Sequence, residues 1–136
     1  MQSSKTPQWM LATGAIFALS AVMIGAFGAH GLKQVLDGYA LSLIETAAKY
    51  QMYHAIALLI LGVMSNLSQF SKRWLNWAGS FFTLGVFLFS GSLYLLAFSH
   101  VKWLGAVTPL GGLALMLGWL ILIITIYKGA ASIKPE

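Results

Sequence analysis

The stretch WLGAVTPLGGLALMLGWLILIITIY, residues 103–127, contains no charged residue. A helix needs about 20 mostly apolar residues to cross the hydrocarbon core of a bilayer, and this stretch is long enough. Three more windows are free of charge, at residues 6–32, 50–71 and 74–101. None of them alternates polar and apolar residues as a membrane β-strand does. The sequence therefore predicts an all-α, polytopic membrane protein with four transmembrane helices.

The composition favours the same class. Of the 136 residues, 59% are hydrophobic and 8% are charged, whereas soluble domains carry about 25% charged residues. We expect a single domain over residues 1–136, folded as a compact bundle with helices at about 9–29, 39–66, 75–98 and 108–128. The first apolar run is too long for a secretory signal peptide, so we expect it to be a transmembrane helix.

Two segments suggest how the helices begin. Residues 34–49 carry Asp37, Glu45 and Lys49, and Glu45 and Lys49 form a favourable i,i+4 pair. They predict that the second helix is extended at its N-terminal end by an amphipathic segment in the membrane interface. Thr108-Pro109 is typical of a helix start, with a threonine cap and a proline in the first turn, and predicts the start of the fourth helix.

The basic residues indicate orientation rather than a nucleic-acid partner. The net charge is +5, but the lysines and arginine are scattered through short loops and form no basic stripe. With four helices, five of them share the side of the two termini and three lie on the other. The positive-inside rule then places both termini in the cytoplasm. The first group is Lys5, Lys72, Arg73, Lys128 and Lys134, and the second is Lys33, Lys49 and Lys102.

Small residues recur at helical spacing in the first and last helices. Such residues let helix backbones approach closely in a bilayer, where no hydrophobic force drives helices together. We therefore expect these positions to form packing faces, against helices of the same chain or of a neighbour. They are Gly14, Ala18, Ala21, Gly25 and Gly28 in the first helix, and Gly111 and Gly118 in the fourth.

A set of polar residues is predicted to lie together near the interface opposite the termini. Polar groups in a membrane are costly, so a cluster of them is a candidate site. We expect His30, at the end of the first helix, to meet the segment Tyr50–His54. Hydrogen bonding between helices and binding of a ligand both remain open as the role of this cluster. Its members are His30, Glu45, Tyr50, Gln51, His54, Ser90, Ser92 and Tyr94.

Catalysis and metal binding find little support in these residues. The chain has no cysteine, and no helix presents two histidines at the spacing of a metal motif. Ser90 and Ser92 are not part of a nucleophile elbow, and no phosphate-binding glycine loop is present. We expect no catalytic residue, no metal site and no cofactor.

Two functional hypotheses follow from these observations. The first is a non-catalytic packing, accessory or assembly protein. The second is a binder or carrier of a small amphipathic ligand, such as a quinone, lipid, haem or metal, at the polar cluster. The expected partners are the lipid bilayer and either another membrane protein or a second copy of the chain, but no nucleic acid.

Four motifs in order resemble those of a known family. They are GAFGAHGL at 25–32, YQMYHAIALL at 50–59, FSGSLY at 89–94 and TPLGG at 108–112. The chain resembles domain-of-unknown-function family 423 from about residue 9 to residue 128. The resemblance implies a small four-helix inner-membrane protein and implies no activity or ligand.

Overall fold

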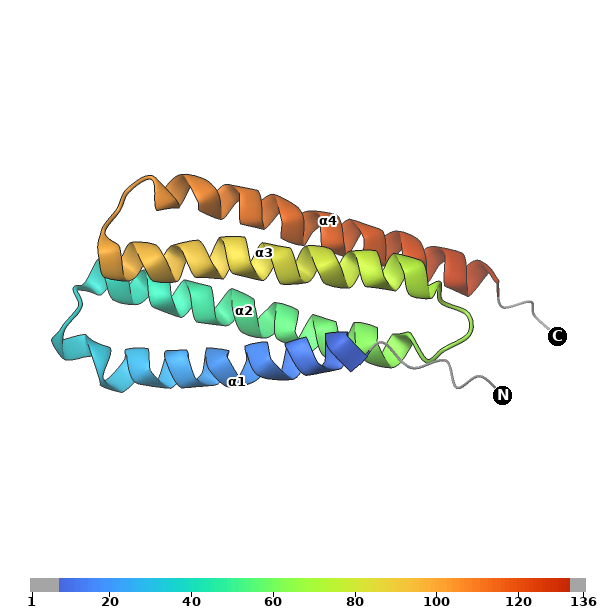
Figure 1. The fold of residues 1–136 in the computed structure, drawn as a ribbon, viewed down its shortest axis with the longest axis horizontal. Coiled ribbons are helices and arrows are strands. Elements are labelled where there is room, and N and C mark those ends of the chain that lie inside the picture. The colour runs from blue at the N-terminus through green and yellow to red at the C-terminus, as the bar shows by residue number, and fades with distance from the viewer. Residues whose placement is uncertain (1–7, 133–136) are drawn as a thin grey trace.

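The computed structural model describes residues 8–132 and contains four long helices within them (Figure 1). They are α1 (Gln8–His30), α2 (Gly38–Met64), α3 (Lys72–Ser99) and α4 (Leu104–Ala131), and a short 3-10 helix, η1 (Leu32–Gln34), connects α1 to α2. Each of the four is long and apolar enough to cross a membrane. The predicted all-α fold with four transmembrane helices is confirmed.

The helices run alternately up and down, with α2 and α3 in the middle (Figure 1). The main packing pairs are α1 with α2, α2 with α3, and α3 with α4. One end of the bundle holds the start of α1, the end of α4 and the connection between α2 and α3, and we call it the terminal end. The other end holds η1 and the connection between α3 and α4, and we call it the loop end. In Figure 1 the terminal end is on the right.

The buried core is unevenly distributed along the bundle. Its larger cluster includes Met10 of α1, Leu58 of α2 and Phe82 of α3, which are fully buried. A smaller cluster, built on Ala40 and Ile44 of α2 with Ala97 of α3, lies toward the loop end. Because α1 contributes no fully buried large side chain to the second cluster, α1 is held less tightly toward the loop end.

The start of α2 is continuous with the rest of that helix. The Asp37 side chain caps it by accepting a hydrogen bond from the backbone N–H of Ala40 at 2.7 Å. Ala40, Ile44 and Ala47 in the following turns are buried against neighbouring helices. The amphipathic segment thus extends α2 in line with the bundle, and its location in the membrane interface stays a prediction.

α4 begins four residues before the predicted start. It begins at Leu104, so Thr108 and Pro109 lie inside the helix rather than at its cap. Pro109 is the sixth residue of α4 and has no N–H to donate to the carbonyl four residues before it, so the helix lacks one backbone hydrogen bond there. The Thr108 hydroxyl instead lies 2.7 Å from that of Ser92 in α3. The predicted helix start is therefore wrong, because a threonine that bonds to another helix has the same residue type as a helix cap.

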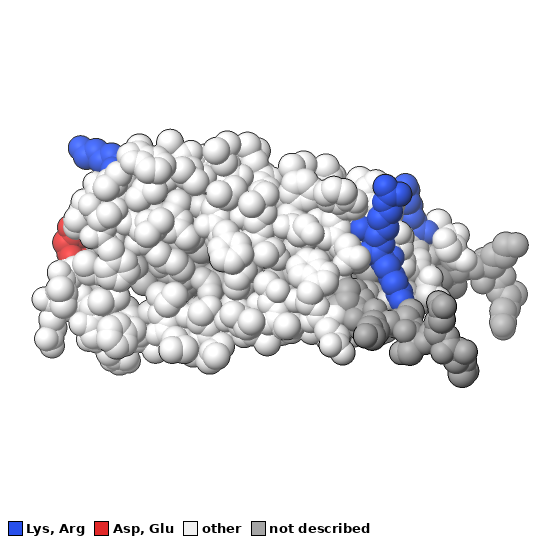
Figure 2. Space-filling view, in the orientation of Figure 1, with Lys and Arg blue, Asp and Glu red and all other residues white. Residues whose placement is uncertain are grey.

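Most charged side chains lie at the two ends of the molecule, and the Glu45–Lys49 ion pair lies along the first half of α2. On the face that it draws, Figure 2 shows the terminal end with a group of Lys and Arg side chains and a broad uncharged belt between the ends. At the terminal end, Lys128 lies over the Trp74 ring, with Nζ 5.1 Å from the ring centroid. Basic and aromatic side chains at the two edges of an apolar belt are typical of proteins that span a bilayer.

Candidate functional site

The centre of the bundle holds a hydrogen-bonded network around Gln51. Gln51 is buried at the midpoint of α2. Its Nε2 donates to the backbone carbonyl of Phe17 at 2.9 Å and to the Ser20 hydroxyl at 2.6 Å, both in α1. Its Oε1 accepts from the Tyr94 hydroxyl of α3 at 2.9 Å. One amide side chain therefore joins three helices.

His54 forms a second link, between α2 and α4. Its Nδ1 lies 2.7 Å from the backbone carbonyl oxygen of Tyr50, and its Nε2 accepts from Trp119 Nε1–H at 3.1 Å. A carbonyl can only accept, so the proton is on Nδ1 and the ring is neutral. Both ring nitrogens are therefore engaged within the protein, and neither faces an open ligand position.

Two serines of α3 add further polar contacts between helices. Ser90 donates to the backbone carbonyl of Ala47 in α2 at 2.8 Å, and Ser92 lies 2.7 Å from Thr108 in α4. Within residues 8–132, every buried side-chain nitrogen or oxygen has a hydrogen-bond partner. The same residues contain no group of three His, Asp or Glu side chains placed to hold a metal ion. The geometry of these contacts favours hydrogen bonding between helices over ligand binding.

Two predicted members of the polar cluster lie outside it, and a third, Tyr50, takes part only through its backbone carbonyl, because its side chain is exposed. His30 is exposed at the end of α1, level with the first part of α2. Gly28 lies beside Ile44, and His54 is ten residues further along α2, which corresponds to about 15 Å at 1.5 Å per residue. The prediction that His30 meets the segment Tyr50–His54 is therefore wrong. Glu45 is also exposed, on the outer surface of α2.

The depth of the cluster also differs from the prediction. Gln51 lies midway along α2, and Ser20 and Trp119 lie near the middle of α1 and α4. The hydrogen-bonded cluster is therefore at the centre of the bundle rather than near the loop end. His30, which the prediction placed in the cluster at the end of the first helix, takes no part in it.

Several predicted small residues do form tight packing faces. A Cβ added at Gly14 would lie 2.8 Å from the Ala55 carbonyl oxygen, and one at Gly118 would lie 2.6 Å from the Phe82 ring. Gly111 lies directly against the backbone of α3 at Leu88 and Phe89. Of the other predicted positions, Ala21 and Gly28 are buried, and Ala18 packs at the edge of the core.

Gly25 departs from this pattern. A Cβ added there would meet only the Cβ of Ala48, at an ordinary 3.9 Å. The expectation that Gly25 is in close contact with another helix is therefore wrong for this chain alone. The space beside Gly25 belongs to a groove between α1 and the first part of α2, with a volume of about 740 Å³.

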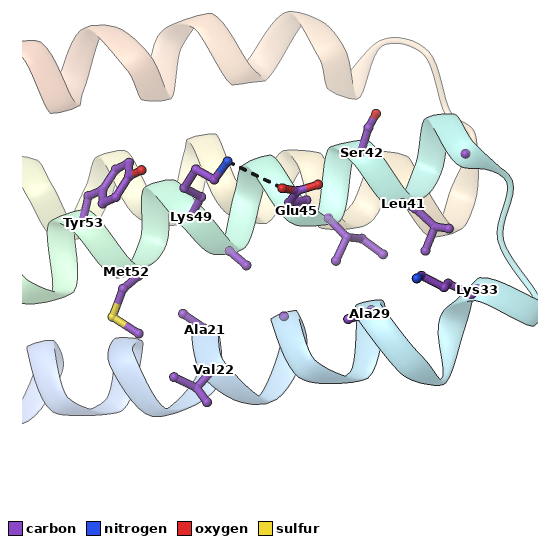
Figure 3. Close-up of a pocket in the computed structure, with 15 residues that line it drawn as sticks. Ala21, Val22, Ala29, Lys33, Leu41, Ser42, Glu45, Lys49, Met52 and Tyr53 are labelled. Carbon is purple, nitrogen blue, oxygen red and sulfur yellow. Dashed lines mark ion pairs between the residues drawn. The ribbon is translucent and has the colours of Figure 1, made fainter.

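The groove has an apolar floor and a charged rim (Figure 3). Lys33, from η1, stands at the loop end with its ammonium group directed back over the end of α1. Glu45 and Lys49 form an ion pair of 3.6 Å on the α2 side, with side chains 75% and 51% exposed. The remaining lining is small or apolar, apart from Ser42 and Tyr53. It comprises Ala21, Val22, Gly25, Gly28, Ala29, Gly38, Leu41, Ile44, Ala48 and Met52.

The sequence analysis named Gly25, Gly28 and Glu45 but did not predict the groove. A usable signal was present, because Ala21, Gly25 and Ala29 are small residues spaced by four on α1, and Gly25 lies beside Ala48 of α2. Small residues on both sides of a helix pair either close the gap between backbones or leave a hollow. Only the crossing of the two helices, which the sequence does not give, decides between these outcomes. Ser20 and Trp119 were also missed as members of the polar network.

Comparisons with known proteins give one consistent result. A family described as "Protein of unknown function (DUF423)" matches residues 24–112. A UPF0382 membrane protein of Staphylococcus aureus (strain bovine RF122) is 47% identical over 86% of this chain and 93% of its own length. Another, of Staphylococcus haemolyticus, is 48% identical over 85% of this chain and 92% of its own length. No solved structure matches this chain.

Proposed function

We propose that this chain, which belongs to the DUF423 family of membrane proteins, is a non-catalytic protein. It holds one amphipathic lipid molecule in the groove between α1 and α2. The observation that carries the proposal is the groove itself. It is open along the outside of the bundle, and its volume of about 740 Å³ exceeds the 340–440 Å³ of three smaller hollows on the molecule. The hydrogen-bonded centre then serves to keep the helices in place.

The length of the groove fits one leaflet of a bilayer. On α1 the lining extends from Ala21 to Ala29, about 12 Å at 1.5 Å per residue. On α2 it extends from Gly38 to Tyr53, about 22 Å by the same rise. Half of the hydrocarbon core is about 15 Å thick. An acyl or isoprenoid chain of the leaflet at the loop end therefore matches the groove in length.

A transmembrane helix fits the groove less well. A helix with its side chains is about 10 Å across and crosses the whole bilayer. Toward the terminal end the gap between α1 and α2 is closed, because Gly14 lies against Ala55 and Leu59. A partner helix would therefore contact the groove along only part of its length. A lipid chain spans only one leaflet and can lie in the groove along its whole length.

The forces on such a chain differ from those in water. A lipid chain that enters the groove exchanges one apolar environment for another, so it gains little from the hydrophobic effect. Its binding depends on van der Waals contacts with the groove floor and on its polar head. Small floor residues such as Gly25 and Ala29 let the chain lie close to the helix backbone.

The non-catalytic part of the proposal is supported by the use of the polar side chains. Gln51 bonds to α1 and α3, and His54 bonds to the Tyr50 carbonyl of its own helix and to Trp119 of α4. Ser90 and Ser92 donate to backbone carbonyls. No nucleophile in this network faces a base across an open space. Hydrogen bonds between transmembrane helices are a common means of fixing their arrangement.

We also propose that the protein lies in the cell inner membrane with both termini in the cytoplasm. The sequence places five Lys or Arg on the side of the termini, among them Lys72 and Arg73 in the first turn of α3 and Lys128 in the last turn of α4. The opposite side carries three, which are Lys33 and Lys102 near the helix ends and Lys49 further along α2. The positive-inside bias follows this difference. The groove then belongs to the outer leaflet.

Native mass spectrometry of the purified protein tests the proposal. The wild type is expected to retain one lipid per chain. Gly25→Leu places a side chain in the groove without a backbone clash, because the nearest atom to the new Cβ is 3.9 Å away. This variant should remain folded and lose the lipid. Ala29→Leu, elsewhere on the floor, should act in the same direction.

Gly91→Leu is the matched control. Gly91 is a helical glycine of α3 that does not line the groove, and a Cβ there meets nothing within 4 Å. It should retain the lipid. Equal lipid occupancy in the wild type and Gly25→Leu would contradict the proposal. A wild-type dimer that Gly25→Leu abolishes would show that a second copy fills the groove instead, and would also overturn it.

A further inference from the structure

We infer that the lipid in the groove is an anionic phospholipid, whose phosphate is bound by Lys33 at the groove's rim. This inference rests on the proposed function and adds the chemistry of the head group. Three observations carry it: the charge of the lining, the position of Lys33, and the apolar floor below it.

The charges of the lining sum to one positive charge. Three charged side chains line the groove, and they are Lys33, Glu45 and Lys49. Glu45 and Lys49 form an ion pair at 3.6 Å, so their charges largely offset each other. Within residues 8–132, no carboxylate is in an ion pair with Lys33. The nearby Asp37 carboxylate accepts a hydrogen bond from the backbone N–H of Ala40 at the start of α2. A ligand with one negative charge complements this lining.

The position of Lys33 suits a head group. It lies in η1, beyond the end of α1 and therefore at the loop end, where the chain leaves the apolar belt. Figure 3 shows its side chain at the same end of the groove as Leu41 and Ala29. A phosphodiester at this level leaves its acyl chain to run along Gly25 and Ala21 toward Met52 at the bundle centre. The lysine ammonium is a compact charge that binds phosphate without a fixed orientation.

The same chemistry distinguishes this ligand from neutral amphipathic molecules. A quinone or a diacylglycerol has no anionic group, so it would leave the Lys33 charge uncompensated at the rim. A zwitterionic phospholipid carries a phosphate, but its own cation offsets the attraction of the groove. We therefore expect phosphatidylglycerol to bind more tightly than phosphatidylcholine of the same acyl composition.

The size of the preference follows from one lysine near a membrane surface. Such a residue contributes about 1 kcal/mol toward an anionic lipid, which corresponds to about a fivefold difference in binding. The competition experiment uses purified full-length protein, delipidated and titrated with dioleoyl phosphatidylglycerol and dioleoyl phosphatidylcholine. Native mass spectrometry then counts each bound lipid.

The wild type should prefer phosphatidylglycerol about fivefold. Lys33→Gln should bind either lipid and lose most of the preference. Lys102→Gln is the matched control, because Lys102 is a loop-end lysine that does not line the groove, and its preference should match that of the wild type. A preference that survives in Lys33→Gln, or that Lys102→Gln removes equally, would contradict the inference.

Two further results separate this inference from the proposed function. Binding of both lipids with equal affinity would overturn the choice of head group and leave the lipid groove standing. Binding of neither lipid would overturn both. Millimolar glycerol phosphate should not displace the bound lipid, since it lacks the acyl chain. Displacement by glycerol phosphate would show that a soluble phosphate, rather than a lipid, is the ligand.

Discussion

Two adjacent glycines of α4 offer a sharp test of the helix packing. A Cβ added at Gly111 would lie 2.7 Å from the Phe89 Cα and 2.8 Å from the Leu88 carbonyl carbon, both backbone atoms of α3. A Cβ added at Gly112 would meet only the Cδ2 atom of the Phe89 ring, at 3.9 Å. Gly111→Ala should therefore destabilise the protein strongly, whereas Gly112→Ala should not.

The magnitude follows from how far the helices must separate. Ordinary contact begins near 3.4 Å, and the atom nearest to the new Cβ is the Phe89 backbone nitrogen, which is closer than its Cα. The helices α3 and α4 must therefore move apart by about 1 Å to admit the new methyl group. A gap of this size forfeits about a quarter to a half of the contact energy of the atoms that line it. Overpacking of this kind costs about 1–3 kcal/mol. The gain of helix propensity from Gly to Ala, about 1 kcal/mol, is common to both variants and cancels in their comparison.

Equilibrium unfolding in mixed micelles, titrated with a denaturing detergent and followed by circular dichroism, measures the difference. We expect Gly111→Ala to be less stable than Gly112→Ala by about 1–3 kcal/mol. Equal stabilities, or a more stable Gly111→Ala, would refute the close approach of α3 and α4.

Three further predictions concern the polar centre and the orientation. Gln51→Leu removes three hydrogen bonds and should cost about 2 kcal/mol at the mean value for membrane proteins. A double-mutant cycle with Tyr94→Phe should show a coupling of about 0.6 kcal/mol, and a coupling of zero would argue against their bond. His54→Phe removes the hydrogen bonds to Trp119 and to the Tyr50 carbonyl. In the unfolding assay this variant should lose about 1 kcal/mol of stability, and mass spectrometry should find the lipid still bound. Loss of the lipid from a folded variant would make His54 part of a binding site. Because the chain has no cysteine, single cysteines at Ser132 and Lys102 report orientation, and a membrane-impermeant thiol reagent added outside cells should label only the second.

Much of the fold could be predicted because the signals are long. Four charge-free windows each exceed the thickness of a bilayer core, so the existence of four helices depends on no single residue. The start of α4 was less predictable, because Thr108 has the residue type of a cap but bonds to Ser92 of another helix. Local chemistry cannot show whether a hydroxyl bonds within its own helix or across to a neighbour.

The candidate sites were predictable only in part. Gln51 and His54 are polar residues in an apolar run, and their burial with partners follows from the cost of unsatisfied polar groups. The partners themselves, Ser20 and Trp119, depend on how the helices are rotated and crossed. The groove depends on the same geometry, since Gly14 and Gly25 look alike in sequence but one is in tight contact and the other is open.

The most direct test of the central claim is nuclear magnetic resonance of the protein with one equivalent of phosphatidylglycerol in perdeuterated detergent. The account predicts nuclear Overhauser effects between the lipid's acyl chain and the methyl groups of Ala21 and Met52, which line the groove. The exposed methyl group of Ala26, which does not line it, should show none. Equal effects at all three methyl groups, or effects at Ala26 alone, would contradict a lipid held in the groove.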